Sequence, residues 1–286
     1  MDFLLKLRYI AVLPILILTL LTSPKAADTE TAVMTGEDVF VLEQALIMGQ
    51  GITTDGEYYY TSGAIAALNL TFLAKFTVED FRYVESKINP LPDVCEERGN
   101  NHIGGISYYD GKIYASVEGP DEGYPCIAVY DAETLTCNGE VYDLPVELYD
   151  DGVPWCAVNP ENGYLYASKW SDAETVYVYD VNNEMTLVKE IALKGLGGID
   201  RIQGGEFYNG TLYLSNDCHN NGNIKNILSV NIETGEVAVA AERNVGGENV
   251  EAEGMTFSVD ENGVTMHVLD YNKIIGVFVR HYKVEF

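Results

Sequence analysis

Apolar and polar residues alternate along most of this chain in short runs, and glycine-rich turns separate the runs. One phrase returns about every 50 residues. It begins with a glycine next to a branched apolar residue, passes through an Asp-Gly or Asn-Gly turn, and leads into a Tyr-x-Ser sequence, as in residues 104–116. The alternation and the enrichment in Tyr and β-branched residues predict strands. Copies of the phrase begin at Gln50, Gly104, Trp155, Gln203 and Glu253.

The repeats predict a ring of small sheets. A complete repeat carries four strand-like runs, and a repeat of this length and content is typical of a β-propeller blade. The fifth repeat ends after its third run, whereas an additional run, Val39–Leu46, precedes the first repeat. Pairing of these two segments would close the ring and protect an exposed sheet edge. We therefore predict an all-β fold, a single propeller of five four-stranded blades that is closed by an N-terminal strand in the last blade.

The N-terminal segment differs in composition from the repeats. Lys6 and Arg8 precede an apolar run, Tyr9–Leu21, and polar residues follow it, which is the order of an export signal. The run is short for a membrane span, and both cleavage after export and retention as an anchor stay open. We predict an export signal or N-terminal membrane anchor at 1–27, a tether at 28–37 and the propeller domain at 38–286. The protein is then secreted or tethered to the outer face of the cytoplasmic membrane.

The net charge of −27 narrows the classes of partner. Nucleic acids and anionic lipids both require basic protein surfaces, so we expect no nucleic acid, and membrane contact only through the N-terminal segment. A small molecule, a peptide or a surface protein stays open as the partner. The charge indicates either solubility in a salty or extracellular medium or a bound cation such as Ca²⁺.

Export would permit disulfides among the five cysteines. Cys126 and Cys137 flank a predicted hairpin, so we expect them near each other across it. Buried free thiols are the alternative.

Polar residues of all repeats are expected to converge at one mouth of the channel. The first strand of a blade lies at the channel, so the starts of first strands and the ends of second strands meet on one face of the ring. A mixture of carboxylates, bases and Trp there would perturb the pKa values of its members, as functional sites do, whereas a merely water-filled channel is also polar. The starts supply Gln50, His102, Trp155, Arg201, Gln203, Glu251 and Glu253, and the ends supply Glu118, Lys169, Trp170, Asn216, Asp217 and Asp270.

The repeated phrase resembles two kinds of known propeller. Over residues 50–286 it is similar to the NHL-repeat and gluconolactonase (senescence marker protein) type, in whose lactonases Glu, Asn and Asp at inner-strand ends hold a divalent metal. This resemblance implies Ca²⁺ or another divalent cation, with Glu253, Asn216 and Asp217 as its ligands. Residues 50–52 and 60–63 resemble plant-type glutaminyl cyclases, which are five-bladed and carry Glu where Thr61 stands.

Three functions stay open on these residues. The channel binds a ligand or protein without catalysis, or a metal there polarises a carbonyl for hydrolysis with His102 or Glu251 as the base. In the third, Trp155 and Gln50 cradle a peptide N-terminus while Glu253 shuttles protons, as in a glutaminyl-cyclase-like acyltransferase. The catalytic candidates are therefore His102, Glu251 and Glu253. The candidates for ligand contact are Gln50, Glu118, Trp155, Lys169, Trp170, Arg201, Gln203 and Asp270.

Overall fold

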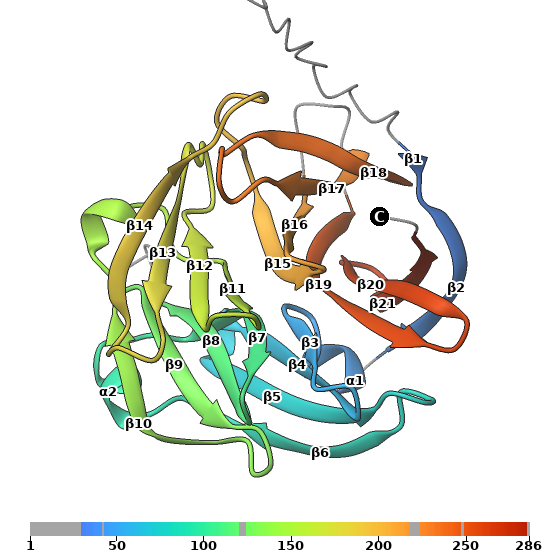
Figure 1. The fold of residues 1–286 in the computed structure, drawn as a ribbon. Helices are drawn as coiled ribbons and strands as arrows, with labels where there is room; N and C mark the ends of the chain where they lie inside the picture. The colour runs from blue at the N-terminus through green and yellow to red at the C-terminus, as the bar shows by residue number, and fades with distance from the viewer. Residues whose placement is uncertain (1–29, 42, 120–123, 218–223, 247–248, 285–286) are drawn as a thin grey trace, which may run out of the picture.

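Five sheets surround a central axis, and the innermost strand of each sheet faces that axis (Figure 1). The structure is a computed structural model that describes residues 30–41, 43–119, 124–217, 224–246 and 249–284. Each sheet contains four strands that belong to one blade, so the predicted five-bladed all-β propeller is confirmed. The predicted export segment at 1–27 lies outside the described residues, as does Cys218.

The blades follow one another along the chain. The first consists of β3 (Ile52–Thr54), β4 (Tyr58–Ile65), β5 (Leu70–Thr77) and β6 (Tyr83–Ile88). The second consists of β7 (His102–Tyr109), β8 (Lys112–Glu118), β9 (Cys126–Asp131) and β10 (Thr136–Asp143), and the third of β11 (Trp155–Asn159), β12 (Tyr164–Ser168), β13 (Thr175–Asp180) and β14 (Thr186–Ala192). The fourth consists of β15 (Ile202–Tyr208), β16 (Thr211–Asn216), β17 (Ile224–Val230) and β18 (Val237–Gly246), and the fifth of β19 (Val250–Asp260), β20 (Gly263–Asn272), β21 (Gly276–Lys283) and β2 (Val33–Phe40).

Among the residues that the structure describes, helical structure is confined to short connecting segments. They are α1 (Glu43–Leu46), α2 (Asp93–Glu97) and the 3-10 turns η1 (Ala66–Leu68) and η3 (Val146–Leu148). Within the described part of the chain, no helix is long and apolar enough to cross a membrane.

The ring is closed by β2, which pairs antiparallel with β21 from Val33 opposite Lys283 to Phe40 opposite Val277 (Figure 1). The prediction of an N-terminal closing strand is confirmed, but its predicted position at Val39–Leu46 is wrong, because residues 43–46 form α1. The outermost strand of a blade pairs mainly through its backbone, and only Phe40 of β2 is buried, so apolar content did not locate it.

A second N-terminal strand joins the neighbouring blade. β1 (Glu30–Thr31) pairs parallel with β18, the outer strand of the fourth blade. The segment predicted as a tether at 28–37 therefore contains β1 and half of β2. Together the two strands attach the N-terminal segment to the fourth and fifth blades.

The hydrophobic core is divided into five clusters, one between each pair of neighbouring blades. The recurring Tyr of the Tyr-x-Ser sequence belongs to these clusters in four blades, at Tyr60, Tyr114, Tyr166 and Tyr213. Its ring fills the space between blades, where an aromatic side chain buries a large apolar area. The tyrosines of the phrase therefore join blade to blade.

Glycine and serine of the repeated phrase allow the inner strands to approach closely. A Cβ on Gly104 would lie 2.5 Å from the Pro154 carbonyl oxygen of the next blade, so a side chain there would push the blades apart. The Ser62 hydroxyl donates to the Gly104 carbonyl at 2.6 Å, and the Ser116 hydroxyl donates to the Gly105 carbonyl at 2.9 Å. These buried hydrogen bonds explain why the phrase ends in serine.

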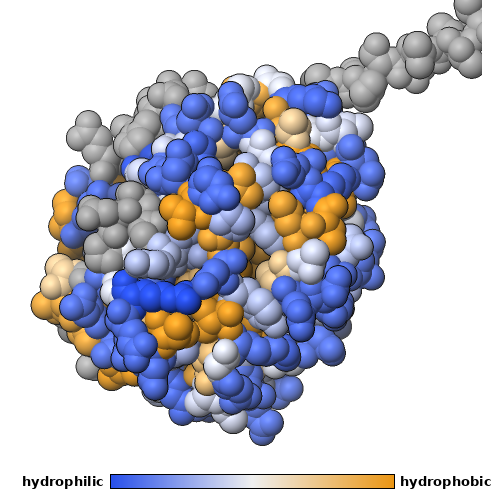
Figure 2. Space-filling model, turned by 90° about the vertical axis from the view of Figure 1, so that its left-hand side faces the viewer, coloured by the Kyte–Doolittle hydropathy of each residue, from blue (hydrophilic) through white to orange (hydrophobic). Residues whose placement is uncertain are grey.

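The outer surface is mostly polar. Figure 2 shows the side of the ring that carries β14 and β10, where apolar residues form separate small groups between hydrophilic ones. The distribution agrees with the large negative charge, since like charges keep the surface hydrated.

A chain of hydrogen bonds joins the closing strand to the first blade. Asp38 of β2 lies 3.0 Å from His281 Nε2, and His281 Nδ1 lies 2.7 Å from His267 Nδ1. The carboxylate of Asp38 only accepts, so the His281 Nε2 carries hydrogen. Either Nδ1 can donate to the other, and His267 Nε2 lies 2.7 Å from Ser258 Oγ and 2.9 Å from Tyr59 Oη. The chain therefore joins β2 through two histidines to β19 and β4.

We expect this chain to make stability depend on pH. Burial, and then the charge of His281, lowers the pKa of His267 from 6.5 to about 3. The unfolded state therefore binds the extra proton first, and the free energy of unfolding falls as pH decreases from about 6.5 toward 3. Urea denaturation should show a loss of about 2 kcal/mol between pH 7 and pH 5 beyond that of His267→Asn, which takes no proton. Parallel pH profiles of the two proteins would contradict this.

Candidate functional site

A polar pocket of about 350 Å³ opens at one mouth of the channel, and every blade contributes to its wall. Eight of the predicted site residues line it, namely Gln50, His102, Glu118, Trp170, Arg201, Gln203, Glu251 and Glu253. Asp151 and Pro154 complete the lining. The prediction that first-strand starts and second-strand ends meet on one face thus agrees with the arrangement of most of these residues.

His102 stands at the start of β7 between two polar neighbours. Its Nε2 lies 2.9 Å from Gln50 Oε1 of the first blade. Its Nδ1 lies 3.1 Å from Glu118 Oε1 of β8, an ion-pair contact that is not aligned as a hydrogen bond. The other oxygen of Glu118 accepts from the Val153 backbone N–H at 2.7 Å. The imidazole is therefore fixed across the boundary of the first two blades.

Arg201 is held by both its backbone and its side chain. Its φ of 58° is in the left-handed region, which a non-glycine residue adopts only when its surroundings enforce it. The backbone N–H donates to the Trp170 carbonyl at 2.7 Å, and the backbone carbonyl accepts from the Asp217 N–H at 2.9 Å. The guanidinium lies over the Trp170 ring at 5.0 Å. A positive group is thus fixed in the pocket wall at the cost of backbone strain.

A set of paired charges surrounds Arg201 and extends from the buried Asp217 and Lys225 to the exposed Lys273. Arg201 Nε donates to Asp217 Oδ2 at 2.9 Å, and Arg201 Nη2 lies 3.3 Å from Glu251 Oε1. Asp217 is also paired with the buried Lys225, and its Oδ1 accepts from the Ala252 N–H at 3.2 Å. Lys273 lies 2.8 Å from the same oxygen of Glu251. Both carboxylates are therefore neutralised by basic neighbours.

Glu253 differs from these paired carboxylates. Its residue is only 2% exposed, and no described residue hydrogen-bonds to or pairs with its carboxyl group. Burial, and then the charges of Glu251 and Asp217, raises the pKa of Glu253 well above its ordinary value, although Arg201 acts in the opposite direction. Burial and these charges therefore favour the protonated form of its carboxyl group, which borders the pocket. A pairing irregularity between Ala252 and Met255 directs it there, as bulges near sites commonly do.

A second acid lies in the channel. Glu206 of β15 accepts from Thr53 Oγ1 at 3.2 Å and from Thr256 Oγ1 at 3.3 Å, two residues on the facing inner strands β3 and β19. Burial raises the pKa of Glu206 to about 7. Glu206 does not line the pocket at the mouth.

The remaining predicted residues lie outside the pocket lining. Trp155 is fully buried, and its Nε1 donates to Ser168 Oγ at 3.0 Å. Lys169 contacts Asp150 at 3.2 Å. The Asn216 amide donates to the Asp200 carbonyl at 2.6 Å. Asp217 is paired with Arg201, as described above.

Asp270 forms a buried network of its own. Both terminal nitrogens of Arg243 donate to it, at 2.8 and 2.9 Å, and Arg280 lies at 2.5 Å. Asp270 and the Arg243 side chain are completely buried. The network ties β18 of the fourth blade to β20 and β21 of the fifth. Asp270 thus joins blades beneath the surface.

Sequence reasoning missed the residues that support the site from neighbouring elements. Asp151 precedes the third blade and holds Ser171 through the Ser171 backbone N–H at 2.9 Å. Asp151 belongs to the sequence Asp150-Asp151-Gly152, which is a turn signal and could have placed this residue in the loop before the third blade. Lys225 reaches Asp217 from the third strand of its blade, and no feature of the repeated phrase indicates that contact.

Comparison with known proteins supports the fold. No known family profile matches the chain, and no curated protein matches it. Among solved structures it is similar to the glutaminyl cyclase of Myxococcus xanthus, with a TM-score of 0.62 and 14% identity over 90% of this chain and 99% of that one. It is also similar to the tail fiber of Staphylococcus aureus phage P68, with a TM-score of 0.53 and 17% identity over 86% of this chain and 52% of that one. At these identities the likeness indicates the propeller fold, and it does not confirm the NHL-repeat or gluconolactonase type.

Proposed function

We propose that the channel-mouth pocket binds a small molecule or a peptide terminus through a basic or amide nitrogen, and that Glu253 exchanges a proton with it. The buried carboxyl of Glu253 at the pocket wall, to which no described residue pairs, is the observation that carries this proposal, and its raised pKa supports it. A protonated carboxyl donates from one oxygen and accepts at the other. A bound amine or amide supplies the hydrogen-bond partners that no described residue provides for the carboxyl group of Glu253.

The charges around the pocket support a nitrogen-bearing ligand. Glu118, Asp151 and Glu251 line it with Arg201 as the permanent cation, and Arg201 is already paired with Asp217 and Glu251. Neither Glu118 nor Asp151 has a Lys or Arg partner among the described residues, and their negative charge attracts a positive group and disfavours an anion. Trp170 adds an aromatic edge to the wall, and its Nε1 donates to Gln203 Oε1 at 3.1 Å.

Cyclisation of an N-terminal glutamine is the reaction that this arrangement favours. The similarity to a glutaminyl cyclase over nearly the whole chain supports it, together with the acid Glu253 in the pocket lining, for which no described residue provides a hydrogen bond or ion pair. In this reaction the α-amine nitrogen attacks the side-chain amide carbon, a ring C–N bond forms, and the C–NH₂ bond breaks to release ammonia. One proton must pass from the amine to the leaving nitrogen. Glu253 would accept it at one oxygen while donating from the other, which general acid–base catalysis requires.

The predicted roles of other residues change in this proposal. Trp155 is buried in the core, so Trp170 takes its place beside Gln50 as the aromatic wall for a peptide terminus. His102, fixed between Gln50 and Glu118, would orient the substrate amide.

The divalent-cation site stays a prediction that these residues fit poorly. Both oxygens of Asp217 contact basic side chains, and the Asn216 amide is engaged with a backbone carbonyl. Among the described residues, no group of three His, Cys, Asp or Glu side chains is placed to hold a metal ion. Metal-dependent hydrolysis is therefore not the function we propose.

A peptide that begins with glutamine tests the proposal. We expect it to raise the melting temperature and to be converted to the cyclised form with release of ammonia, measured by mass spectrometry and an ammonia assay. The same peptide with an acetylated N-terminus, which lacks the amine, should do neither. A melting-temperature rise without turnover would support binding and reject cyclisation. Equal responses to both peptides, or a rise with Ca²⁺ that Glu253→Gln abolishes, would overturn the amine proposal.

A further inference from the structure

Two buried cysteines meet at the junction of the α2 segment and the second blade. Cys95 lies in α2 and Cys126 begins β9, and their sulfur atoms are 3.8 Å apart. Both residues are completely buried. A disulfide needs a sulfur separation of about 2.05 Å, so the two atoms must approach each other by less than 2 Å. The predicted neighbour of Cys126 was Cys137, but in the β9–β10 ladder Cys137 stands opposite Tyr130 and Cys126 opposite Asp143, so that prediction is wrong.

The surroundings hold the two thiols together. The Asn100 side-chain amide donates to the Tyr124 carbonyl at 2.9 Å and lies 3.9 Å from Cys126 Sγ. Arg98 pairs with Asp143, the residue opposite Cys126 in β10. These contacts attach the α2 segment to β9 and β10 on both sides of the sulfur pair.

The two sulfurs differ chemically. The hydrogen bond from Cys126 lowers the pKa of Cys95, and the positive charge of Arg98 lowers it further against the effect of burial. The same hydrogen bond, with burial, raises the pKa of Cys126. Thiolates are the attacking species in thiol–disulfide exchange, and Arg98 lies only three residues from Cys95, so Cys95 is the first nucleophile.

We propose that Cys95 and Cys126 are an oxidisable pair that forms a structural disulfide when the chain folds in the presence of a disulfide donor such as oxidised glutathione. The Cys95 thiolate attacks one donor sulfur, forms a mixed disulfide and releases one donor thiol. The Cys126 thiolate then displaces the second donor thiol. Two cysteine thiols and one donor disulfide thus become one protein disulfide and two donor thiols. Both sulfurs are buried in the native fold, so the exchange takes place during folding or when α2 opens.

The bond would link the two ends of the segment that contains the inner hairpin of the second blade. The chain between the two cysteines contains β7 and β8, and β7 carries His102. A crosslink that closes a loop of this size lowers the conformational entropy of the unfolded chain. We therefore expect the melting temperature to rise by about 5–10 °C. This inference stands apart from the proposed function, because it involves no residue of the channel-mouth pocket.

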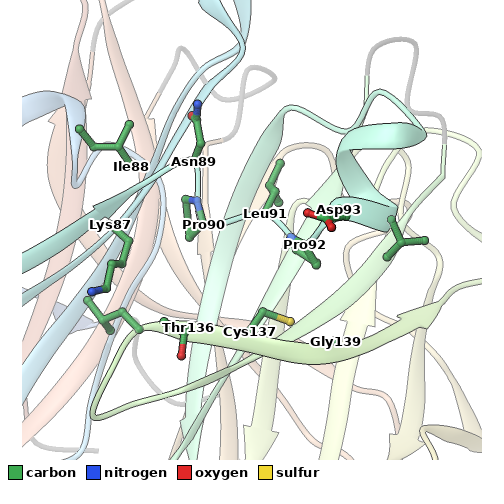
Figure 3. Close-up of a pocket in the computed structure, with 12 residues that line it drawn as sticks. Lys87, Ile88, Asn89, Pro90, Leu91, Pro92, Asp93, Thr136, Cys137 and Gly139 are labelled. Atoms are coloured by element: carbon green, nitrogen blue, oxygen red, sulfur yellow. The ribbon is translucent and has the colours of Figure 1, made fainter.

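Cys137 provides a matched control. It lies on β10 beside the α2 segment and lines a pocket of about 630 Å³ together with Pro90, Pro92 and Asp93 (Figure 3). Burial raises its pKa, and its sulfur contacts the Glu140 carbonyl at 3.7 Å. It is a nearby half-buried thiol without the Cys95–Cys126 geometry, so it should stay reduced.

The test is refolding of the full chain with oxidised glutathione, followed by thiol counting under denaturing conditions and peptide mapping. Wild type and Cys137→Ser should yield a linked peptide pair containing Cys95 and Cys126, and should melt about 5–10 °C higher than their reduced forms. Cys95→Ser and Cys126→Ser should lack both the link and the rise. Absence of the link in wild type, or a link from either cysteine to Cys137, would overturn the proposal. A link without any rise in melting temperature would overturn its stabilising role.

Discussion

Glu253→Gln is expected to lower turnover of an N-terminal glutamine peptide by about 10²–10⁴-fold while the fold persists. The amide has nearly the shape of the protonated carboxyl, but it cannot pass a proton from one oxygen to the other. Steady-state kinetics by ammonia release, with circular dichroism on the same samples, measure both parts of this expectation. Retention of full turnover would remove Glu253 from the proposed chemistry.

The pH dependence of stability tests the Glu253→Gln substitution independently of turnover. Burial and the neighbouring carboxylates raise the pKa of Glu253 above the unfolded value of 4.5, so the folded state holds this proton more tightly. The wild type therefore loses stability as pH rises above 4.5, until the folded pKa is passed. The variant lacks that loss and should be more stable than wild type at neutral pH.

Glu206→Gln is the matched control for Glu253. Glu206 is also a channel acid with a raised pKa, but it does not line the pocket. It should share the gain in stability above pH 7 and retain turnover. Equal loss of turnover in both variants would indicate a general effect of channel charge.

Removal of residues 1–40 is expected to lower the melting temperature by about 10–20 °C relative to removal of residues 1–29. The longer deletion takes away β1 and β2, exposes the edge of β21 and uncovers the cluster that contains Phe40. Loss of a paired strand and a buried Phe costs on the order of 5 kcal/mol, and each kcal/mol corresponds to about 2–4 °C in a domain of this size. Differential scanning calorimetry of the two proteins provides the measurement. Equal melting temperatures would show that ring closure contributes nothing.

The blades could be predicted from the sequence because an Asp-Gly or Asn-Gly turn recurs in every repeat. Asp-Gly and Asn-Gly positions such as Gly111 and Gly210 have positive φ, as these turns require. The closing strand was misplaced because β2 is exposed along most of its length and pairs through its backbone. A pattern of buried side chains cannot locate such a strand.

The pocket was predicted at the starts of the innermost strands, where three blades share one irregularity of strand pairing. The innermost strand pairs of the second, fourth and fifth blades each contain a register shift near their start, and their predicted residues His102, Arg201 and Glu253 line the pocket. The β11–β12 pair of the third blade is regular. The alternation of channel-facing and core-facing side chains in β11 is therefore offset from that in β7, β15 and β19. As a result Pro154 lines the pocket and Trp155 packs into the core. The β3–β4 pair of the first blade is also regular, and one sequence carries no sign of which repeats contain the register shift.

Ring closure by β2 also determines when this protein becomes a folded molecule. β2 is synthesised before the strands of all five blades that pair around it, whereas its partner β21, at Gly276–Lys283, follows them. Contacts between residues so far apart in the chain form slowly, and they cannot form before β21 has been synthesised. Until then β2 has no sheet partner and the edge of β20 is unpaired, and other chains can join both. The time spent waiting for the last strand is thus the period in which this propeller is most exposed to aggregation and to chaperones.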